Sequence, residues 1–466
     1  MLRLSSYLII SDRLRNGGYA LLGGLSGSIE LINEDLYELI TQLRNKPPHE
    51  LYINEHDFPD ELLEKYIKRG FITELSHPEE RQLLSIIATA LHERETAKPT
   101  VVIVPELDCN YRCVYCFERS WLDKLPSAKS KMDLAEVAAV YKAIEQIPIK
   151  NGNKIEQVIL FGGEPLLQAN KQLVQRIVEQ GRAIGLRFMA VTNGHDLEGY
   201  LDLLGKEKIA ALQITIDGPA AIHDKRRIAR DGSSSFAKII ANMRRALCET
   251  KVQITIRINL DQENYSALKE LLDIFKAEKW LNNQKVLINV AIVHQKDTAG
   301  LIIPQHDINN VRGELLEMVD EYSNIEIGSA QASHNEQIFS SLLVGKPYAL
   351  RSSFCAASCG MYVFMPGGRI SSCWESLNNE DSYIGHYTPE GLSLNEQRVK
   401  HRFGRSAAKI PQCADCKFCL ICGGGCSTHA ECEFHDVYQP HCDDFPQTYS
   451  WVLADAVENY LKINGL

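Results

Sequence analysis

The sequence predicts an α/β protein in which a parallel β-sheet flanked by helices lies between a small α+β unit and a cysteine-rich end. From Val101 to about His294, six strand-like apolar runs alternate with stretches of helical periodicity. This alternation is typical of repeated β-α units, which build a parallel sheet with helices outside it. Most of the 14 cysteines lie between Cys355 and Cys442. Clustering of this kind favours metal ligation over scattered structural thiols.

The composition is that of an ordinary globular protein. A chain of 466 residues is too long for one small core, so we expect about two to four domains. Hydrophobic residues make up 45% and charged residues 24% of the chain, which argues against extensive disorder. The net charge of -10 provides no electrostatic footprint for a nucleic acid or an anionic membrane.

The sequence shows no sign of export or membrane insertion. No apolar run approaches the ~20 residues that a membrane helix needs. The first apolar stretch is too short for a secretory signal and ends at Ser11. We therefore expect a cytoplasmic location, where disulfides are rare.

Residues 1–95 are predicted to form the α+β unit. The expected strands and helices are Ser6–Ile10, Tyr19–Leu22, a helix at about Asn33–Leu43, a second helix at Glu61–Lys68, and a closing strand at Phe71–Thr73. A polar helical linker follows and breaks at Pro99.

Residues 96–325 are predicted to form the α/β part. Its expected strands are Val101–Leu107, Val158–Phe161, Phe188–Thr192, Leu212–Asp217, Val252–Leu260 and Val286–Val293. Its expected helices are Leu134–Ile147, Lys171–Ile184, Phe236–Leu247, Ser266–Phe275 and a bridging helix at about Asp307–Tyr322. A partial barrel and an open doubly wound sheet both fit this pattern.

Three cysteines follow the first of these strands directly. Cys109, Cys113 and Cys116 therefore occupy the loop at the C-terminal end of a strand, where α/β folds place their chemistry. Their thiolates can surround one compact inorganic cluster. A [4Fe–4S] cube has four irons, so three cysteines leave one iron open to an outside ligand. The alternative is a zinc site with three cysteines and a distant histidine.

The motif CxxxCxxC, with Tyr115 before its last cysteine, resembles the signature of the radical S-adenosylmethionine (SAM) superfamily. The resemblance implies a partial (β/α)6, TIM-like barrel that binds SAM at the open iron. After the second strand, four residues resemble the family's GGEP motif, whose backbone holds the SAM amino group: Gly162, Gly163, Glu164 and Pro165. Glycines suit this role because they let backbone groups approach a ligand closely.

Further segments resemble those that line the SAM pocket in this family. Asn193 follows the third strand, and Thr215 and Asp217 follow the fourth. The resemblance also implies that Tyr115 packs on the adenine and that an arginine lies near the SAM carboxylate. The candidates are Arg226, Arg227 and Arg230, of which we select Arg227. A solvated basic helix start is the alternative for this arginine group.

The C-terminal cysteines have the short spacings that iron–sulfur or zinc sites require. With Ile384-Gly385, they resemble the SPASM domain, which holds two auxiliary [4Fe–4S] clusters in relatives. Carried over by position, the first cluster has the ligands Cys355, Cys359, Cys373 and Cys426, and the second has Cys413, Cys416, Cys422 and Cys442. The resemblance thus implies three clusters within the chain and a SPASM domain at residues 326–466. We interpret Cys248, Cys419 and Cys432 as thiols outside the clusters. A pair of zinc ribbons is the alternative.

The layout of residues 1–95 is similar to the winged-helix, PqqD-like recognition element (RRE) of peptide-modifying pathways. In that family a leader peptide adds a strand to the sheet edge and packs on a helix, a recognised binding mode. A structural cap on the barrel is the alternative.

Together, these resemblances imply an enzyme that cleaves SAM reductively to a 5′-deoxyadenosyl radical and removes hydrogen from a peptide. Two auxiliary clusters offer a path for the second electron, which favours net oxidation. We therefore predict a radical SAM oxidoreductase that cross-links a ribosomally made precursor peptide, through a thioether first and a carbon–carbon bond second. A flavodoxin- or ferredoxin-like protein is the expected electron donor.

Two other functions fit parts of the sequence. An anaerobic sulfatase-maturing, formylglycine-forming enzyme is expected to carry an aspartate after the third cysteine of the C-terminal region, but Cys373 is followed by Trp374 and Glu375. Glu375 remains a candidate proton acceptor, with a surface carboxylate as the alternative. An iron–sulfur electron carrier or redox sensor predicts damaged SAM motifs, whereas CxxxCxxC and GGEP are intact.

Overall fold

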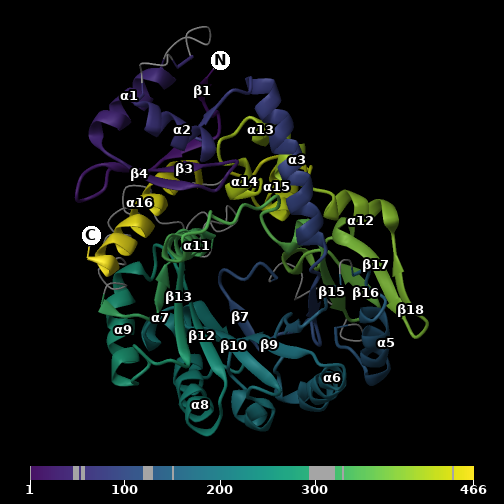
Figure 1. Ribbon diagram of the computed structural model, residues 1–466. Coiled ribbons are helices and arrows are strands. Elements are labelled where there is room, and N and C mark those ends of the chain that lie inside the picture. Colours follow the sequence, from purple (N-terminus) through teal and green to yellow (C-terminus); the bar gives the residue numbers. More distant parts are fainter. Residues whose placement is uncertain are drawn as a thin grey trace. The chain divides into compact units, whose positions relative to one another are not determined.

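The computed structural model describes residues 2–45, 52–53, 58–118, 130–149, 152–292, 321–327, 330–442 and 445–465. They form two compact units (Figure 1). The first unit comprises Met1–Ala97, Ala330–Cys359 and His401–Leu466, and the second comprises Lys98–Ser329 and Gly360–Lys400. Val293 and nearly all of the expected bridging helix at Asp307–Tyr322 lie outside the described residues. Within the described ranges, no helix combines the length and the apolar character needed to cross a membrane.

The second unit is built on a parallel sheet that contains the six predicted strands in chain order. They are β6 (Thr100–Ile103), β8 (Gln157–Leu160), β9 (Arg187–Thr192), β10 (Ile209–Thr215), β12 (Gln253–Leu260) and β13 (Val286–Ile292). Two further parallel strands flank them, with β14 (Ile325–Ile327) beside β13 and β15 (Met361–Met365) beside β6. This confirms the α/β class. Among the described residues the sheet is open at β14 and does not close into a full barrel.

Helices cover the outer face of this sheet (Figure 1). They are α5 (Leu134–Ile144), α6 (Lys171–Ala183), α8 (Ser235–Glu249) and α9 (Leu268–Ala277). Each buries an apolar stripe, as Leu173, Val174, Ile177 and Val178 do in α6. Their spacing puts these side chains on one face of the helix, which packs against the apolar sheet. The sequence predicted all four helices to within a few residues at each end.

The parallel sheet continues into an antiparallel meander. After β15 come β16 (Arg369–Ser371), β17 (Tyr383–Thr388) and β18 (Gly391–Leu394). Helix α5 packs on this extension, where Lys142 Nζ donates to the Pro389 carbonyl (2.8 Å). The turn between β16 and β17 carries Cys373 and Glu375. Helix α12 (Glu396–Phe403) then leads from the second unit back to the first.

The N-terminal part of the first unit has the α+β composition that the sequence predicts. Its strands are β1 (Arg3–Leu4), β2 (Leu8–Ile10), β3 (Tyr19–Gly23), β4 (Ile29–Ile32) and β5 (Ile72–Thr73), and its helices are α1 (Glu34–Arg44), α2 (Asp60–Lys68) and α3 (His77–Thr96). Strands β2, β3 and β4 form an antiparallel sheet, and β1 pairs with β5. Strand β4 was not predicted from the sequence. This short strand ends directly before Asn33, whose side chain caps α1.

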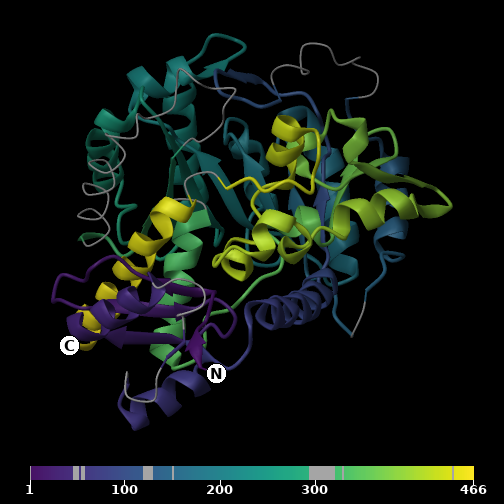
Figure 2. The same cartoon turned by 90° about the horizontal axis from the view of Figure 1, so that it is seen from above.

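The C-terminal part of the first unit is mostly helical. It contains α11 (Ala330–Val344), the short helices α13 (Pro411–Ala414), α14 (Cys419–Cys422) and α15 (Ser427–Phe434), and the long α16 (Phe445–Asn464). Apolar residues of α16, such as Tyr449 and Val452, share a core with Ala20 and Leu22 of β3. Figure 2 shows α16, in yellow, lying along the purple N-terminal sheet.

Candidate active site

A two-stranded antiparallel sheet carries the middle cysteine of the first motif. Strand β7 (Tyr111–Cys113) pairs antiparallel with β11 (Arg227–Ala229), which follows α7 (Ala220–Arg226). The register places Cys113 opposite Arg227, and both side chains are buried. Because side chains alternate along a strand, Ile228 points outward and is 42% exposed. This strand pair therefore fixes an arginine beside a motif thiol.

The three thiols of the motif lie within electrostatic reach of one another. Burial raises the pKa of Cys109 well above its usual value, with further contributions from Glu164, Cys113 and Cys116. Burial likewise raises the pKa of Cys116 to about 12. Burial raises the pKa of Cys113, while the nearby Arg227 lowers it. Metal binding requires thiolates. The positive charge of iron in a cluster would stabilise these buried sulfurs in their ionised form. The donor set fits such a cluster.

The glycines of the GGEP segment allow its backbone to lie directly against the segment that leads to Cys109. Gly162 has a φ of 123°, and a Cβ atom on it would lie 2.5 Å from the Glu106 carbonyl oxygen. A Cβ atom on Gly163 would lie 2.3 Å from the Asp108 carbonyl oxygen. No other residue fits this approach without displacing the backbone.

Glu164 is buried, and its carboxylate links the ends of two strands by hydrogen bonds. Its carboxylate accepts hydrogen bonds from Thr192 Oγ1 (2.6 Å), the Asn193 backbone N–H (2.6 Å) and the Leu166 backbone N–H (2.8 Å). Burial raises its pKa to about 7, against these hydrogen bonds, which lower it. The side chain of Asn193 donates to Asn110 Oδ1 (2.7 Å). Glu164 and Asn193 thus tie the cysteine loop to the ends of β8 and β9. Pro165, the last residue of the motif, is buried.

The hydroxyl of Tyr115 lies at the centre of a second buried network. It donates to the Asp217 carboxylate and accepts from Arg227 Nη1 (2.8 Å) and Asn259 Nδ2 (3.2 Å). Asp217 is almost fully buried at the end of β10. Thr215 belongs to the same strand and pairs in register with Arg257 of β12. The predicted residues Tyr115, Thr215, Asp217 and Arg227 therefore meet at one edge of the sheet.

The three candidate arginines differ in their partners. Arg226 is bound to the Asp261 carboxylate through both terminal nitrogens (2.7 and 2.8 Å), and its guanidinium lies over the Tyr115 ring (5.1 Å). Arg230 is half exposed and pairs with Asp108 (3.0 Å). Arg227 is buried, and its Nε has no hydrogen-bond partner among the described residues. The Arg226 Nε has no hydrogen-bond partner there either, but the terminal nitrogens of Arg226 already bind Asp261, whereas those of Arg227 have no carboxylate bound at hydrogen-bond distance among the described residues.

Sequence reasoning missed Asn259 and Asp261 in this network. Both stand at the C-terminal end of β12, which is the edge where α/β enzymes gather their polar groups. Their position at the end of a predicted strand was the one signal in the sequence that could have identified them.

A cavity of about 230 Å³ opens beside the first cysteine of the motif. Its lining includes Cys109, Asn110, His195 and Arg230. The His195 Nδ1 atom lies 3.0 Å from the Tyr111 hydroxyl, so this histidine is tied to strand β7.

Glu375 lies near the same strand ends. The neighbouring Trp374 ring stacks on Phe161, with ring centroids 5.1 Å apart and planes at 19°. The Arg257 guanidinium is within electrostatic reach of Asp217, Tyr115 and Glu375. Phe161 directly precedes the GGEP segment, so Glu375 and the two polar networks share one side of the sheet.

Most of the C-terminal cysteines belong to the first unit, whereas Cys373 belongs to the second. Burial raises the pKa of Cys413 to about 12, with further contributions from Cys422, Cys442 and Cys416. The four residues expected to share the second auxiliary cluster are thus within mutual reach. Cys419 is 2% exposed and packs in an apolar cluster with Tyr7 and Leu420.

The sequence model of the Radical SAM superfamily matches residues 104–275, the range that holds the cysteine loop and both polar networks. The chain therefore contains a radical SAM domain. Radical SAM enzymes bind a [4Fe–4S] cluster and SAM, in agreement with the thiol set described above. The resemblance that the motifs indicated is confirmed.

Two curated relatives align over most of this chain. The radical SAM cyclopropyl synthase TigE of Paramaledivibacter caminithermalis is 21% identical, over 91% of this chain and 89% of TigE. A cysteine-type anaerobic sulfatase-maturating enzyme of Clostridium novyi is 21% identical, over 70% of this chain and 87% of that enzyme. The fold is similar to native anSMEcpe with bound AdoMet and Cp18Cys peptide, with a TM-score of 0.57, 15% identity, and coverage of 79% of this chain and 100% of that one.

Proposed function

We propose that this radical SAM enzyme oxidatively modifies a ribosomally made precursor peptide. The observation that carries the proposal is the second group of thiols, in which Cys413 lies within electrostatic reach of Cys416, Cys422 and Cys442. A separate sulfur group in the other unit supports an additional cluster, and an oxidation needs such an outlet for its second electron. The peptide named with the anSMEcpe structure supports a peptide substrate.

In this proposal Cys109, Cys113 and Cys116 hold the first cluster, and the Gly162-Gly163 backbone binds the SAM amino group. When bound, SAM and the cluster supply the abstraction of a hydrogen atom from an unactivated carbon. Arg227 balances the negative charge beside Cys113 and offers its unused Nε to an anionic group such as the SAM carboxylate. Tyr115 is held by Asp217 so that its ring can pack on the adenine.

The domain assignment belongs to the same proposal: residues 1–95 as the recognition element, 96–325 as the radical SAM domain and 326–466 as the bridging region with a SPASM domain. Two auxiliary clusters would bring the total to three. The first auxiliary cluster would take Cys355, Cys359, Cys373 and Cys426 as its ligands.

We assign Glu375 as the group that accepts a proton from the substrate during oxidation. Its carboxylate lies within reach of Arg257, which also lies near Tyr115. The aspartate expected of sulfatase-maturing enzymes is absent after Cys373, so Glu375 would take its place from a neighbouring position.

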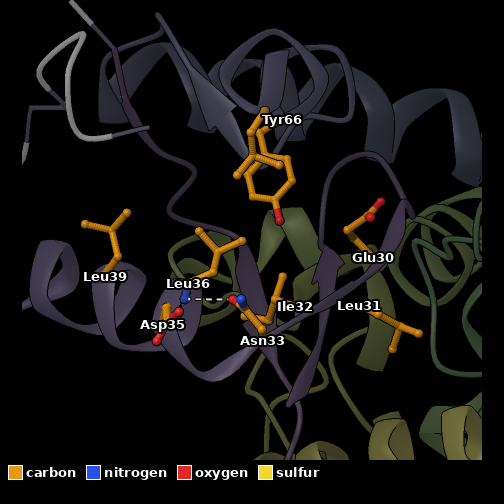
Figure 3. Close-up of a pocket in the computed structure, with 9 residues that line it drawn as sticks. Glu30, Leu31, Ile32, Asn33, Asp35, Leu36, Leu39 and Tyr66 are labelled. Carbon is orange, nitrogen blue, oxygen red and sulfur yellow. Dashed lines mark hydrogen bonds between the residues drawn. The ribbon is translucent and has the colours of Figure 1, made fainter. Parts of the chain in front are cut away.

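The N-terminal sheet offers an edge for the leader peptide. Strand β4 pairs only with β3 among the described residues, so its other side is a sheet edge that can add a strand. At one end of this strand the Ile29 carbonyl accepts from Arg69 Nη2 (2.6 Å). A cavity of about 370 Å³ lies along β4 and is lined in part by Leu31, Leu36 and Tyr66 (Figure 3). Figure 3 shows Leu36 and Leu39 of α1 and Tyr66 of α2 around this space. An extended peptide with alternating apolar side chains fits this edge.

For the new bond, a carbon–carbon link and a thioether are the two candidates. The relative that aligns over 91% of this chain is a cyclopropyl synthase, which supports carbon–carbon bond formation. Formylglycine formation is the second candidate function, because a sulfatase-maturating enzyme aligns over 70% of the chain.

The experiment that tests the proposal is co-expression of the enzyme with each short peptide encoded beside its gene, followed by mass spectrometry. The expected product has lost the mass of a hydrogen pair for each new bond. Thiol alkylation separates the two links, because a thioether consumes a cysteine and a carbon–carbon bond does not. A peptide that gains an aldehyde in place of its thiol would favour the sulfatase-type reaction. Anaerobic SAM cleavage without any peptide change would contradict peptide modification.

A further inference from the structure

A buried arginine without an acidic partner lies among the cysteines of the first unit. The side chain of Arg405 is fully buried, at 0% exposure. It donates hydrogen bonds to four backbone carbonyl oxygens: those of Val437, Gly424 (2.8 Å), Gly425 (3.0 Å) and Gln439 (3.1 Å). In the part of the chain that the structure describes, no carboxylate pairs with this guanidinium.

Carbonyl oxygens satisfy the donors of Arg405 but do not cancel its charge, and an unpaired buried charge is costly. Four cysteine sulfurs are the leading groups within electrostatic reach that can carry negative charge: Cys413, Cys426, Cys355 and Cys422. Burial lowers the pKa of Arg405, and these sulfurs raise it. Cysteines that are cluster ligands carry the negative charge that can balance Arg405.

Another arginine of the same segment has the usual partner. Arg402 is 6% exposed and forms a two-pronged ion pair with Glu431 (2.6 and 2.9 Å). Two buried arginines thus stand three positions apart, one facing a carboxylate and the other facing sulfur. The contrast indicates that the environment of Arg405 is specific to the cysteine sites.

The carbonyl partners of Arg405 connect it to a ligand. The backbone N–H groups of Gly424 and Gly425 donate hydrogen bonds to the Cys422 sulfur, which lowers the pKa of that thiol against the larger effect of burial. Their carbonyl oxygens accept from Arg405. The guanidinium therefore orients the peptide groups that contact the sulfur, in the way that outer partners orient metal ligands elsewhere.

We propose that Arg405 is a positioning residue that acts as the fixed counter-charge of both auxiliary clusters. This inference rests on the proposed function, since it requires the auxiliary clusters. By the ligand assignment above, Cys355 and Cys426 belong to one cluster and Cys413 and Cys422 to the other. One guanidinium would serve both, and it would set how easily they accept the electron that leaves the substrate.

The sign of the effect follows from Coulomb's law. A cluster that accepts an electron gains negative charge, and a nearby fixed positive charge stabilises that reduced state. Cluster potentials depend on net charge and on hydrogen bonds to the sulfurs. Removal of the charge at Arg405 should therefore shift the auxiliary midpoint potentials to more negative values.

The test uses the full chain with Cys109, Cys113 and Cys116 replaced by alanine, so that only auxiliary clusters contribute. After anaerobic reconstitution, iron per chain and midpoint potentials are measured by redox titration with electron paramagnetic resonance. In Arg405→Gln, the reduced-to-oxidised ratio at a fixed potential should fall about tenfold, which equals about 59 mV for a one-electron couple. Arg405→Lys should keep the parent potentials, because it keeps the charge. Arg402→Gln is the matched control and should not shift them.

Each outcome decides the proposal. Equal potentials in Arg405→Gln and Arg405→Lys would overturn it, and so would an equal shift in Arg402→Gln. If Arg405→Gln fails to retain iron, the comparison moves to iron content, where Arg405→Lys must retain more. Equal iron loss in the two variants would mean that Arg405 only joins backbone loops, which also overturns the proposal. An iron-free parent protein would instead overturn the auxiliary clusters themselves, and with them the proposed function.

Discussion

The Tyr115 hydroxyl donates a hydrogen bond to the Asp217 carboxylate, and this bond joins the cysteine loop to the end of strand β10. The two residues are 102 positions apart in the sequence. Arg227 and Asn259 donate to the same hydroxyl. The aromatic residue before the last motif cysteine is therefore held by polar contacts as well as by packing.

We predict that Tyr115→Phe weakens both the fold and SAM cleavage. The substitution leaves buried Asp217 and Arg227 without one partner each, which costs about 1–3 kcal/mol. Loss of alignment should slow the release of 5′-deoxyadenosine by about 10-fold to 100-fold. Thermal unfolding and single-turnover SAM cleavage measure the two effects.

Tyr141→Phe is the matched control for this change. Its buried hydroxyl donates to the Ile177 carbonyl (2.5 Å) on the helical side of the sheet. The variant should lose stability and retain the rate of SAM cleavage. Equal rate losses in the two variants would mean that the Tyr115 hydroxyl has no specific part in alignment.

Iron content should distinguish the first cluster from the two proposed auxiliary clusters. Replacement of Cys109, Cys113 and Cys116 together should lower iron from roughly twelve to roughly eight atoms per chain and abolish SAM cleavage. Cys248→Ala and Cys419→Ala should keep the full iron content, because Cys248 is exposed and Cys419 packs in an apolar cluster. Iron loss in Cys419→Ala would make this cysteine a ligand.

The strands of the second unit were predictable because apolar residues recur along each run and one face is buried, as the alternation in β9 and β12 shows. The cysteine and GGEP segments were recognisable because their spacing is local. The hydrogen-bond partners of Tyr115 could not be recognised in this way, because Asp217 and Asn259 are distant in sequence and come close to Tyr115 only in the folded chain. The grouping of α11 and α16 with the N-terminal sheet is equally non-local, and local periodicity carries no information about it.

Acid should destabilise the second unit through His223. Burial lowers its pKa to about 3, and its Nδ1 accepts a hydrogen bond from the Asp217 backbone N–H (3.2 Å). A folded-state pKa below the unfolded value of about 6.5 means that stability is complete above pH 6.5. It is lost progressively as pH falls towards 3, by about 2 kcal/mol at pH 5.

The His223→Asn variant isolates this effect. Denaturant midpoints measured between pH 7 and pH 5 should fall less steeply in His223→Asn than in the parent protein. His334 has a pKa lowered to about 3 by burial in the first unit, so some acid sensitivity should remain. Identical pH profiles for the parent and His223→Asn would contradict the prediction.

Glu375→Gln should separate hydrogen abstraction from product formation. Without a proton acceptor, SAM cleavage should continue while the oxidised peptide forms about 10²-fold to 10⁴-fold more slowly. The measurement is the ratio of 5′-deoxyadenosine to modified peptide. Glu380→Gln, an exposed position in the same loop, should leave this ratio unchanged. An unchanged ratio in Glu375→Gln would return Glu375 to the role of a surface carboxylate.

Leader binding should depend on the apolar edge of β4. Leu31 is 43% exposed on this strand and lines the adjoining cavity. An aspartate there would be desolvated by an incoming apolar peptide, so Leu31→Asp should weaken binding of a fluorescent leader peptide at least about tenfold, or about 1.4 kcal/mol. Ile86→Asp changes a residue of α3 that is 61% exposed and outside the cavity lining, and it should bind the leader normally. Both variants should process a leaderless core peptide at the parent rate, because both positions belong to the first unit and lie outside the radical SAM domain. Normal leader affinity in Leu31→Asp would leave β4 as the edge of a structural cap.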